Sequence, residues 1–285
     1  MNHSLTIVIP AYNEASGLPA VLDSLRTFDV DGASARVIVV DDGSSDDTAR
    51  VAGQHGATVI RHARNLGYGA ALKSGFRCAE TPFVATMDAD GQHTVEALAA
   101  VWARRHDADM VVGARSGLHA PLWRMPGKWC LGAMARYLSR QPIPDLNSGL
   151  RVYRRDVLTR YLHLCPSGFS LTTTITLALL SRGWRVVYAP IAVRPRTGRS
   201  TVTLVTGLET IILILRVLSL FNPLRVFVPV AALTAGVGIA WGVPIALAGR
   251  GVSVGSMLAI VTAVILFALG LLCDQISQLR LERFE

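Results

Sequence analysis

The last quarter of the chain contains two long stretches without a charged residue, and they constrain its fold more than any other feature. Residues 226–249 carry no charge, and after Arg250 the same holds for residues 251–273. Each stretch exceeds the roughly 20 apolar residues that a helix needs to cross the hydrocarbon core of a bilayer. Core helices of soluble proteins usually keep a polar face, and these stretches have none. The sequence therefore predicts a hairpin of two transmembrane helices over residues 223–285, with a cytoplasmic C-terminal tail.

The segment before this hairpin is also apolar, but it contains polar residues at intervals that place them near one helical face: Thr206, Glu209, Arg216 and Ser219. If this segment crossed the bilayer, Glu209 and Arg216 would lie in hydrocarbon at a cost of a few kcal/mol each. A helix that lies in the membrane interface avoids that cost. We therefore expect an amphipathic interfacial helix over residues 203–222, between a globular domain at 1–202 and the hairpin.

The distribution of charge suggests both an orientation and a class of partner. The net charge is +8, and beside membrane helices a basic balance indicates anionic lipid and phosphate rather than nucleic acid. Arginines flank the predicted hairpin on both sides, and only Arg250 lies between its helices. The positive-inside rule then predicts a multi-pass protein of the cell membrane with its globular domain in the cytoplasm. The four cysteines lack the spacing of a zinc site or a disulfide framework.

The first 115 residues alternate short β-branched runs with segments of helical composition. Strands are expected at residues 5–10, 36–42, 58–62, 83–90 and 110–115, and helices at 16–28, 46–53, 68–79 and 94–106. This alternation is typical of an α/β fold with a doubly wound, mostly parallel, Rossmann-like sheet. Such sheets bind ligands at the carboxyl ends of their strands.

Polar side chains follow three of these strands. Asn13 and Glu14 follow the first, Asp41 and Asp42 close the second, and Asp88-Ala89-Asp90 closes the fourth. Two carboxylates two residues apart can converge on one hard cation, and such an ion could neutralise a departing diphosphate. Asp41 and Asp42 are placed to accept hydrogen bonds from a base or ribose. The chain has neither a Walker nor a Rossmann glycine fingerprint, which argues against nucleotide hydrolysis and hydride transfer.

Several of these motifs together resemble the family 2 glycosyltransferases of GT-A fold. They are Val8–Glu14, the Asp-Asp-Gly-Ser run from Asp41, Asn65-Leu66-Gly67 and Asp88–His93. The similarity is greatest to the dolichyl- and polyprenyl-phosphate mannosyl- and glucosyltransferases, in which residues like 113–115, 145–151 and 196–200 recur in the same order before a membrane hairpin. The resemblance implies inverting transfer of a hexose from a UDP- or GDP-linked donor to a polyprenyl or dolichyl phosphate. Mg²⁺ or Mn²⁺ is the implied cofactor.

The resemblance also implies roles for individual residues. Those expected at the nucleoside are Pro10, Tyr12, Asn13, Glu14, Asp41 and Asp42. Those expected at the metal and diphosphate are Asp88, Asp90 and Gln92, which with Arg124 and Arg196 form the expected catalytic set. Those expected at the phosphates of donor and acceptor are Arg115, Arg124, Arg196, Arg199 and Ser200. The chain departs from the family at Thr201 and Tyr68, where a lysine is common, and the second departure bears on donor choice.

Other interpretations remain open at this stage. The acceptor could instead be a diacylglycerol, a glycan or a protein, and a non-catalytic nucleotide-sugar-binding membrane protein would share the fold. The Gln-x-x-Arg-Trp motif of processive polysaccharide synthases is absent. The arginines from Arg151 to Arg160 read as a solvated or lipid-facing surface, and His93 as either a metal ligand, a base or a hydrogen-bonding spacer. A homo-oligomer is compatible with the sequence.

Overall fold

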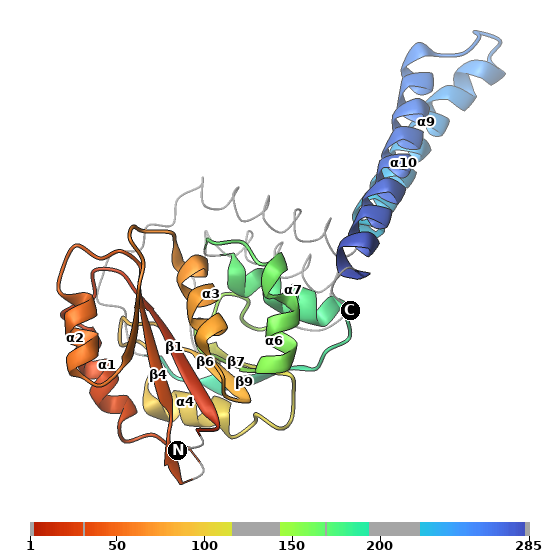
Figure 1. Ribbon diagram of the computed structural model, residues 1–285. Coiled ribbons are helices and arrows are strands. Elements are labelled where there is room, and N and C mark those ends of the chain that lie inside the picture. Colours follow the sequence, from red (N-terminus) through yellow and green to blue (C-terminus); the bar gives the residue numbers. More distant parts are fainter. Residues whose placement is uncertain (1–2, 31, 116–142, 169, 194–222, 283–285) are drawn as a thin grey trace. The chain divides into compact units, whose positions relative to one another are not determined.

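The computed structural model describes residues 3–30, 32–115, 143–168, 170–193 and 223–282 (Figure 1). The chain divides into two compact units, Met1–Thr201 and Val202–Glu285. The interfacial helix expected over residues 203–222 lies outside the described residues.

The first unit is built on one sheet of seven strands in the order β5-β4-β1-β6-β8-β7-β9. The strands are β1 (Leu5–Ala11), β4 (Arg36–Asp41), β5 (Thr58–Arg61), β6 (Phe83–Thr86), β7 (Met110–Arg115), β8 (Arg151–Arg154) and β9 (Val186–Ile191). All neighbouring pairs are parallel except those made by β8, which runs antiparallel to β6 and β7. A separate two-stranded ribbon joins β2 (Asp29–Val30) to β3 (Ala33–Ser34). The prediction of a mostly parallel sheet is confirmed.

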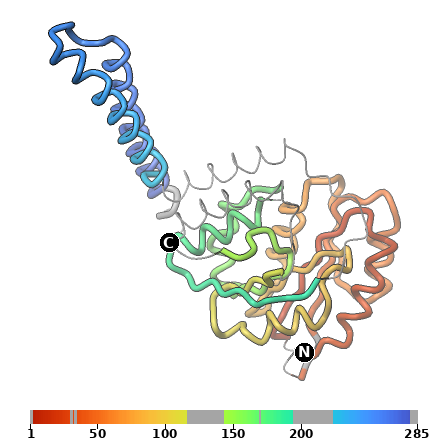
Figure 2. Tube along the Cα trace, turned by 180° about the vertical axis from the view of Figure 1, so that it is seen from behind, coloured from red at the N-terminus to blue at the C-terminus, as the bar shows by residue number. Residues whose placement is uncertain are grey.

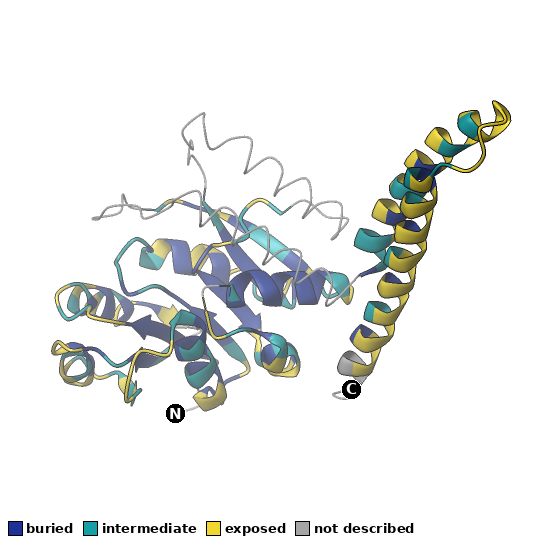
Figure 3. Ribbon diagram, turned by 90° about the horizontal axis from the view of Figure 1, so that it is seen from above, coloured by how far each residue is buried: buried dark blue, intermediate teal, exposed yellow. Residues whose placement is uncertain are grey.

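Helices cover both faces of this sheet, as Figures 1 and 2 show. One hydrophobic core contains residues of α1 (Leu18–Leu25), α2 (Thr48–Gln54) and α4 (Val95–Trp102). The other contains residues of α3 (Tyr68–Cys78), α6 (Arg155–Tyr161), the 3₁₀ turn η2 (Leu162–Leu164) and α7 (Leu171–Ser181). Successive side chains of a strand point to opposite faces, so Ile7 and Ile9 of β1 enter the first core and Val8 enters the second. The central strand β1 is therefore buried along its whole length, and much of the sheet is dark blue in Figure 3.

The strand register gathers the expected site residues at one edge of the sheet. Ala11, the last residue of β1, is level with Asp41, the last residue of β4. On the other side of β1, Val8 is level with Thr86, the last residue of β6. Because these strands are parallel, the loops that follow them leave the sheet at the same edge.

Two differences between the sequence-based boundaries and the structure affect the site. The strand expected over 83–90 ends at Thr86, so Asp88 and Asp90 lie in a loop. The segment after residue 150, to which the sequence analysis assigned no element, forms the antiparallel strand β8 followed by α6. The loop places both aspartates beyond the sheet, where their carboxylates are accessible to a ligand.

The second unit contains α9 (Leu224–Leu247) and α10 (Val254–Glu282), which pack against each other. Close approach is possible because glycines lie at the contact: a Cβ at Gly242 would lie 2.7 Å from Ser256 Oγ, and one at Gly270 would lie 2.6 Å from the Cβ of Phe227. Large apolar side chains point outward, with Leu233 71% and Leu258 65% exposed. Both helices are long and apolar enough to span a bilayer, as predicted.

Candidate active site

The loop after β6 carries the two aspartates around which the site is built. Asp88 is partly buried, and its side chain is 31% exposed. Asp90 is also partly buried, and its Oδ1 accepts a hydrogen bond of 3.1 Å from the backbone N–H of Gln92. This bond fixes the turn from Asp90 to Gln92, so all three expected metal-binding residues belong to one short ordered loop.

Gly149, just before β8, lies directly against the carboxylate of Asp88. A Cβ on Gly149 would lie 2.1 Å from Asp88 Oδ2 and 2.6 Å from Oδ1. The hydroxyl of Thr86 donates to the Gly149 carbonyl at 2.7 Å, and the N–H of Gly113 donates to the Leu150 carbonyl at 2.9 Å. The backbone at Gly149 is therefore anchored, and only glycine leaves room for the carboxylate.

Two further side chains contact Asp88. The hydroxyl of Tyr68 donates to Oδ1 at 3.0 Å, and Nε2 of His93 lies 3.6 Å from Oδ2. Burial, followed by the negative charge of Asp88 and this hydrogen bond, raises the pKa of Tyr68 well above its usual value. Tyr68 is therefore a neutral hydrogen-bond donor. His93 is buried, and within the described part of the chain its Nδ1 has no hydrogen-bond partner.

Arg115, at the end of β7, is oriented by Asp145. Nε of Arg115 donates to Asp145 Oδ2 at 2.6 Å and Nη2 donates to Oδ1 at 3.0 Å, a bidentate pair. Burial tends to raise the pKa of Asp145, but the hydrogen bonds and charge of Arg115 outweigh it and hold that pKa below its usual value. The pKa of Arg115 is raised, first by Asp145 and to a lesser extent by the charge of Asp88. Arg115 and Asp88 thus belong to one electrostatic environment.

Arg151 corrects the expectation of a surface cluster. It is wholly buried, and its guanidinium donates to backbone carbonyls and a hydroxyl: Ser148 O at 2.7 Å, Leu146 O at 2.7 Å, Thr172 O at 2.9 Å and Thr176 Oγ1 at 2.6 Å. These bonds tie the loop before β8 to α7. The same loop supplies Asp145 and Gly149, so Arg151 stabilises the segment that contacts both Arg115 and Asp88. By contrast, Arg154 is exposed and pairs with Asp109 and Asp156.

The two aspartates that close β4 have different environments. Asp42 accepts from His62 Nδ1 at 2.6 Å and from the backbone N–H groups of Leu66 at 3.0 Å and Gly67 at 2.8 Å. Its oxygens are therefore occupied in fixing the loop that leads into α3. Asp41 is fully buried; its Oδ1 accepts from the Ser44 N–H, and its Oδ2 is 3.3 Å from Arg61 Nε but has no hydrogen bond among the described residues. Asp41 Oδ2 is therefore held by an ion pair with Arg61 and not by a hydrogen bond.

The loop after β1 is joined to the loop after β4. Asn13, with the left-handed backbone angle φ 55° that asparagine tolerates, accepts the N–H of Ser45 at 2.9 Å and donates its own N–H to Ser44 Oγ at 2.9 Å. The N–H of Glu14 donates to Thr48 Oγ1 at 2.9 Å. Pro10 is buried and Tyr12 is 48% exposed. Asn13 thus orders the loops, while Tyr12 offers an exposed ring beside them.

The structure brings together most of the expected residues that it describes. The remaining ones, Arg124, Arg196, Arg199 and Ser200, lie outside the described residues. The sequence analysis assigned no contact with Asp88 to Gly149 and Tyr68, and no structural role to Arg151. Gly149 and Arg151 lie within the family motif at residues 145–151, so the sequence marked both positions. It could not show their contacts, which involve residues more than 20 positions away.

The donor set suits a divalent cation that a substrate helps to bind. Among the described residues, no three His, Cys, Asp or Glu side chains are grouped so as to hold a metal ion by themselves. Mg²⁺ commonly uses one or two carboxylates together with substrate phosphates and water. Asp88 and Asp90 match that pattern, with the amide oxygen of Gln92 as a further hard ligand.

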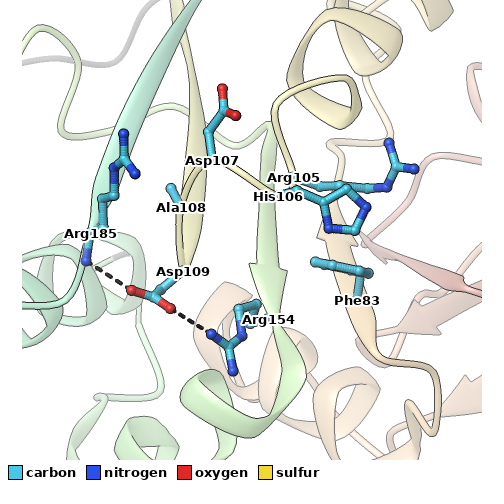
Figure 4. Close-up of a pocket in the computed structure, with 8 residues that line it drawn as sticks. All are labelled: Phe83, Arg105, His106, Asp107, Ala108, Asp109, Arg154 and Arg185. Carbon is cyan, nitrogen blue, oxygen red and sulfur yellow. Dashed lines mark hydrogen bonds and ion pairs between the residues drawn. The ribbon is translucent and has the colours of Figure 1, made fainter.

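A hollow of about 360 Å³ lies at the opposite edge of the sheet (Figure 4). It is lined at the amino ends of β6, β7 and β9 by Phe83, Asp109 and Arg185, and by Arg154 at the end of the antiparallel β8. Asp109 accepts from Arg154 Nη1 at 3.0 Å and from the Arg185 N–H at 2.9 Å, as the dashed lines show. Asp109 therefore fastens strand ends together, and this edge is not where parallel sheets bind ligands.

Comparison with known proteins identifies the family of the chain. The model of the family described as glycosyl transferase family 2 matches residues 6–162, and the model described as the GtrB C-terminal hairpin matches residues 222–279. An uncharacterized glycosyltransferase of Mycobacterium tuberculosis is 38% identical over 200 residues, covering 68% of this chain and 87% of the relative. A dolichyl-phosphate hexose transferase of Haloferax volcanii is 30% identical over 200 residues, covering 69% of this chain and 85% of the relative.

Among solved structures, glucosyl-3-phosphoglycerate synthase of M. tuberculosis, crystallised with Mn²⁺, UDP and glucosyl-3-phosphoglycerate, superposes with a TM-score of 0.62. The identity is 22%, and the match covers 75% of this chain and 80% of the other. At that identity the likeness concerns the fold. The hairpin match and the two long, outwardly apolar helices make the chain a membrane protein with a separate globular unit.

Proposed function

The chain belongs to glycosyl transferase family 2, and we propose that it transfers a hexose from a UDP- or GDP-linked donor to a polyprenyl or dolichyl phosphate. The observation that carries this proposal is that carboxylates and a guanidinium lie at the same edge of the sheet. Asp88 and Asp90 supply hard oxygen ligands there, and Arg115 is oriented by Asp145 within the influence of Asp88. A reaction between two phosphate-bearing substrates requires both kinds of group.

Support for the lipid acceptor comes from the second unit and the relatives. The hairpin of α9 and α10 matches the GtrB hairpin, and a relative that this chain covers over 85% of its length is named a dolichyl-phosphate hexose transferase. A membrane hairpin would hold the enzyme at the surface where a long-chain lipid phosphate is dissolved. We propose that the globular unit faces the cytoplasm, since arginines flank the hairpin on that side.

The proposed chemistry depends on charge more than on proton transfer. A phosphate monoester has a second pKa of about 6, so the acceptor is already largely dianionic at neutral pH. Its oxygen attacks the anomeric carbon while the bond from that carbon to the diphosphate breaks, which inverts the configuration. A divalent cation bound by Asp88, Asp90 and Gln92 would neutralise the departing diphosphate. Arg115 would reduce the repulsion between the two phosphate groups.

The donor nucleoside is proposed to bind along the loops after β1 and β4. Asp41 Oδ2, which pairs with Arg61 in this structure, would accept a hydrogen bond from the base or ribose, and the exposed ring of Tyr12 would contact the base. Asp42 and Asn13 would act by ordering these loops. Arg124, Arg196, Arg199 and Ser200 remain proposed phosphate-binding residues on the strength of the family resemblance.

The test is a donor screen with the full-length protein in detergent and a short-chain polyprenyl phosphate. UDP- and GDP-linked hexoses are supplied in turn with Mg²⁺ or Mn²⁺, and both released nucleoside diphosphate and lipid-linked sugar are measured. We expect one donor class to yield both products, and we expect chelator or Asp90→Asn to abolish them. Failure of every donor to glycosylate the lipid phosphate, with transfer to diacylglycerol instead, would refute the proposed acceptor.

A further inference from the structure

Tyr68 is the first residue of α3, and its hydroxyl donates to Asp88 Oδ1 at 3.0 Å across a sequence separation of 20 residues. We propose that Tyr68 is a positioning residue that fixes the orientation of the Asp88 carboxylate for the cation and donor diphosphate. This inference rests on the proposed function. It assigns a structural task to the position at which the chain departs from the lysine common in its family.

The backbone on both sides of Tyr68 is held in place by hydrogen bonds and close packing. The N–H groups of Leu66 and Gly67 donate to the buried carboxylate of Asp42, which fixes the backbone just before Tyr68. One turn further, the N–H of Ala70 donates to the Ser167 carbonyl at 2.9 Å. Gly69 packs so closely that a Cβ there would lie 2.5 Å from the Gly168 carbonyl oxygen. The start of α3 therefore cannot readily shift to follow a moving carboxylate.

The contacts of Asp88 give its two oxygens different surroundings. Oδ1 accepts from Tyr68, whereas Oδ2 faces His93 Nε2 at 3.6 Å, beyond hydrogen-bond distance. Gly149 bounds the carboxylate on a further side. The terminal torsion of aspartate is broad and roughly twofold, so a donor on one oxygen selects one orientation. Oδ2 is then the oxygen that keeps its lone pairs for a cation.

A neutral phenol suits this task. Tyr68 fixes the carboxylate without cancelling its negative charge, whereas an ammonium group would compete with the cation for that charge. Hydrogen-bond partners that orient a metal-binding side chain commonly contribute 10–100-fold to metal affinity or activity. We therefore expect the same order of effect from the single hydroxyl of Tyr68.

The test compares Tyr68→Phe with Tyr161→Phe in the full-length protein in detergent. Tyr161, the last residue of α6, is a matched control, because its hydroxyl accepts a 2.9 Å hydrogen bond from Trp184 Nε1 and this bond does not involve Asp88. Mn²⁺ binding is measured by electron paramagnetic resonance with saturating UDP, and UDP binding is measured by calorimetry without metal. We expect Tyr68→Phe to weaken Mn²⁺ binding by about 10–100-fold, with UDP affinity within about twofold of wild type. Tyr161→Phe should leave both affinities unchanged.

The outcomes separate this inference from the proposed function. If Tyr68→Phe bound Mn²⁺ as tightly as the wild-type protein, the positioning role would be overturned and the proposed glycosyl transfer would stand. Equal weakening of Mn²⁺ and UDP binding would indicate a general defect of the fold, and it would overturn the role as well. If the wild-type protein transfers sugar but binds no Mn²⁺ with UDP, this inference fails although the transferase activity stands.

Discussion

Replacing Gly149 with alanine tests whether sugar transfer depends on the position of the Asp88 carboxylate. The added Cβ would lie 2.1 Å from Asp88 Oδ2, whereas ordinary van der Waals contacts of a Cβ begin near 3.4 Å. The backbone cannot yield easily, because the Gly149 carbonyl accepts from Thr86 and the next carbonyl accepts from Gly113. The partly exposed carboxylate must therefore move, by roughly 1 Å or more, a misplacement that can cost about 100-fold in rate.

We expect Gly149→Ala to lower kcat for sugar transfer by about 100-fold, equivalent to about 2.7 kcal/mol of barrier. The Tm should fall only slightly, because the carboxylate can move toward solvent without leaving a cavity and loses only its hydrogen bond from Tyr68. The assay is steady-state release of nucleoside diphosphate, with melting followed in the same detergent. Gly53→Ala is the matched control, because Gly53 is exposed on α2 and a Cβ there would meet only Val59 at 4.0 Å. Turnover of Gly149→Ala within about threefold of wild type would refute the reasoning.

Three further outcomes are expected. Arg151→Met removes the donors to the Leu146 and Ser148 carbonyls. At about 1–3 kcal/mol for each unpaired group it should lower the Tm by about 4–24 °C, and a shift below about 2 °C would contradict the support assigned to Arg151. The lowered pKa of Asp145 means that its pairing with Arg115 contributes stability above about pH 4, the usual carboxyl range, and loses it as the pH falls through the lowered pKa. Wild type should therefore melt above Asp145→Asn at neutral pH, and the gap should close in acid; a gap independent of pH would argue against the pair. For topology, a cysteine at Gly251 should react with an impermeant maleimide outside the cell while one added at the C-terminus does not, and the reverse labelling would place the globular unit outside.

Local sequence patterns were sufficient for the elements that surround the site. The β-branched runs predicted β1, β4, β5 and β7 to within about one residue at each end. For β1, β4 and β7, which are largely buried, the reason is that strands covered on both faces need continuous apolar side chains. The uncharged stretches predicted α9 and α10, since length and hydropathy are properties of the segment alone. The short motifs also marked the carboxyl ends of β4 and β6, near which Asp41 and Asp88 lie.

The different contacts made by neighbouring residues could be learned only from the tertiary structure. Asp41 and Asp42 are adjacent and chemically identical, yet only the fold brings His62 and the Gly67 N–H to Asp42 and leaves one oxygen of Asp41 without a hydrogen bond. Arg151 read as a surface residue because arginine is rarely buried. Its acceptors come from the preceding loop and from α7, more than 20 residues later.

The sequence by itself thus determined the alternating strands and helices, the apolar hairpin and the motifs at the strand ends, all of which follow from neighbours along the chain. The tertiary structure decided the antiparallel insertion of β8, the contact of Gly149 with Asp88 and the clasp of Arg115 by Asp145. The physical reason is that hydrophobic periodicity acts over a few residues. Side-chain contacts within a site join residues 20 to 63 positions apart, and only the packed sheet brings them within hydrogen-bond distance.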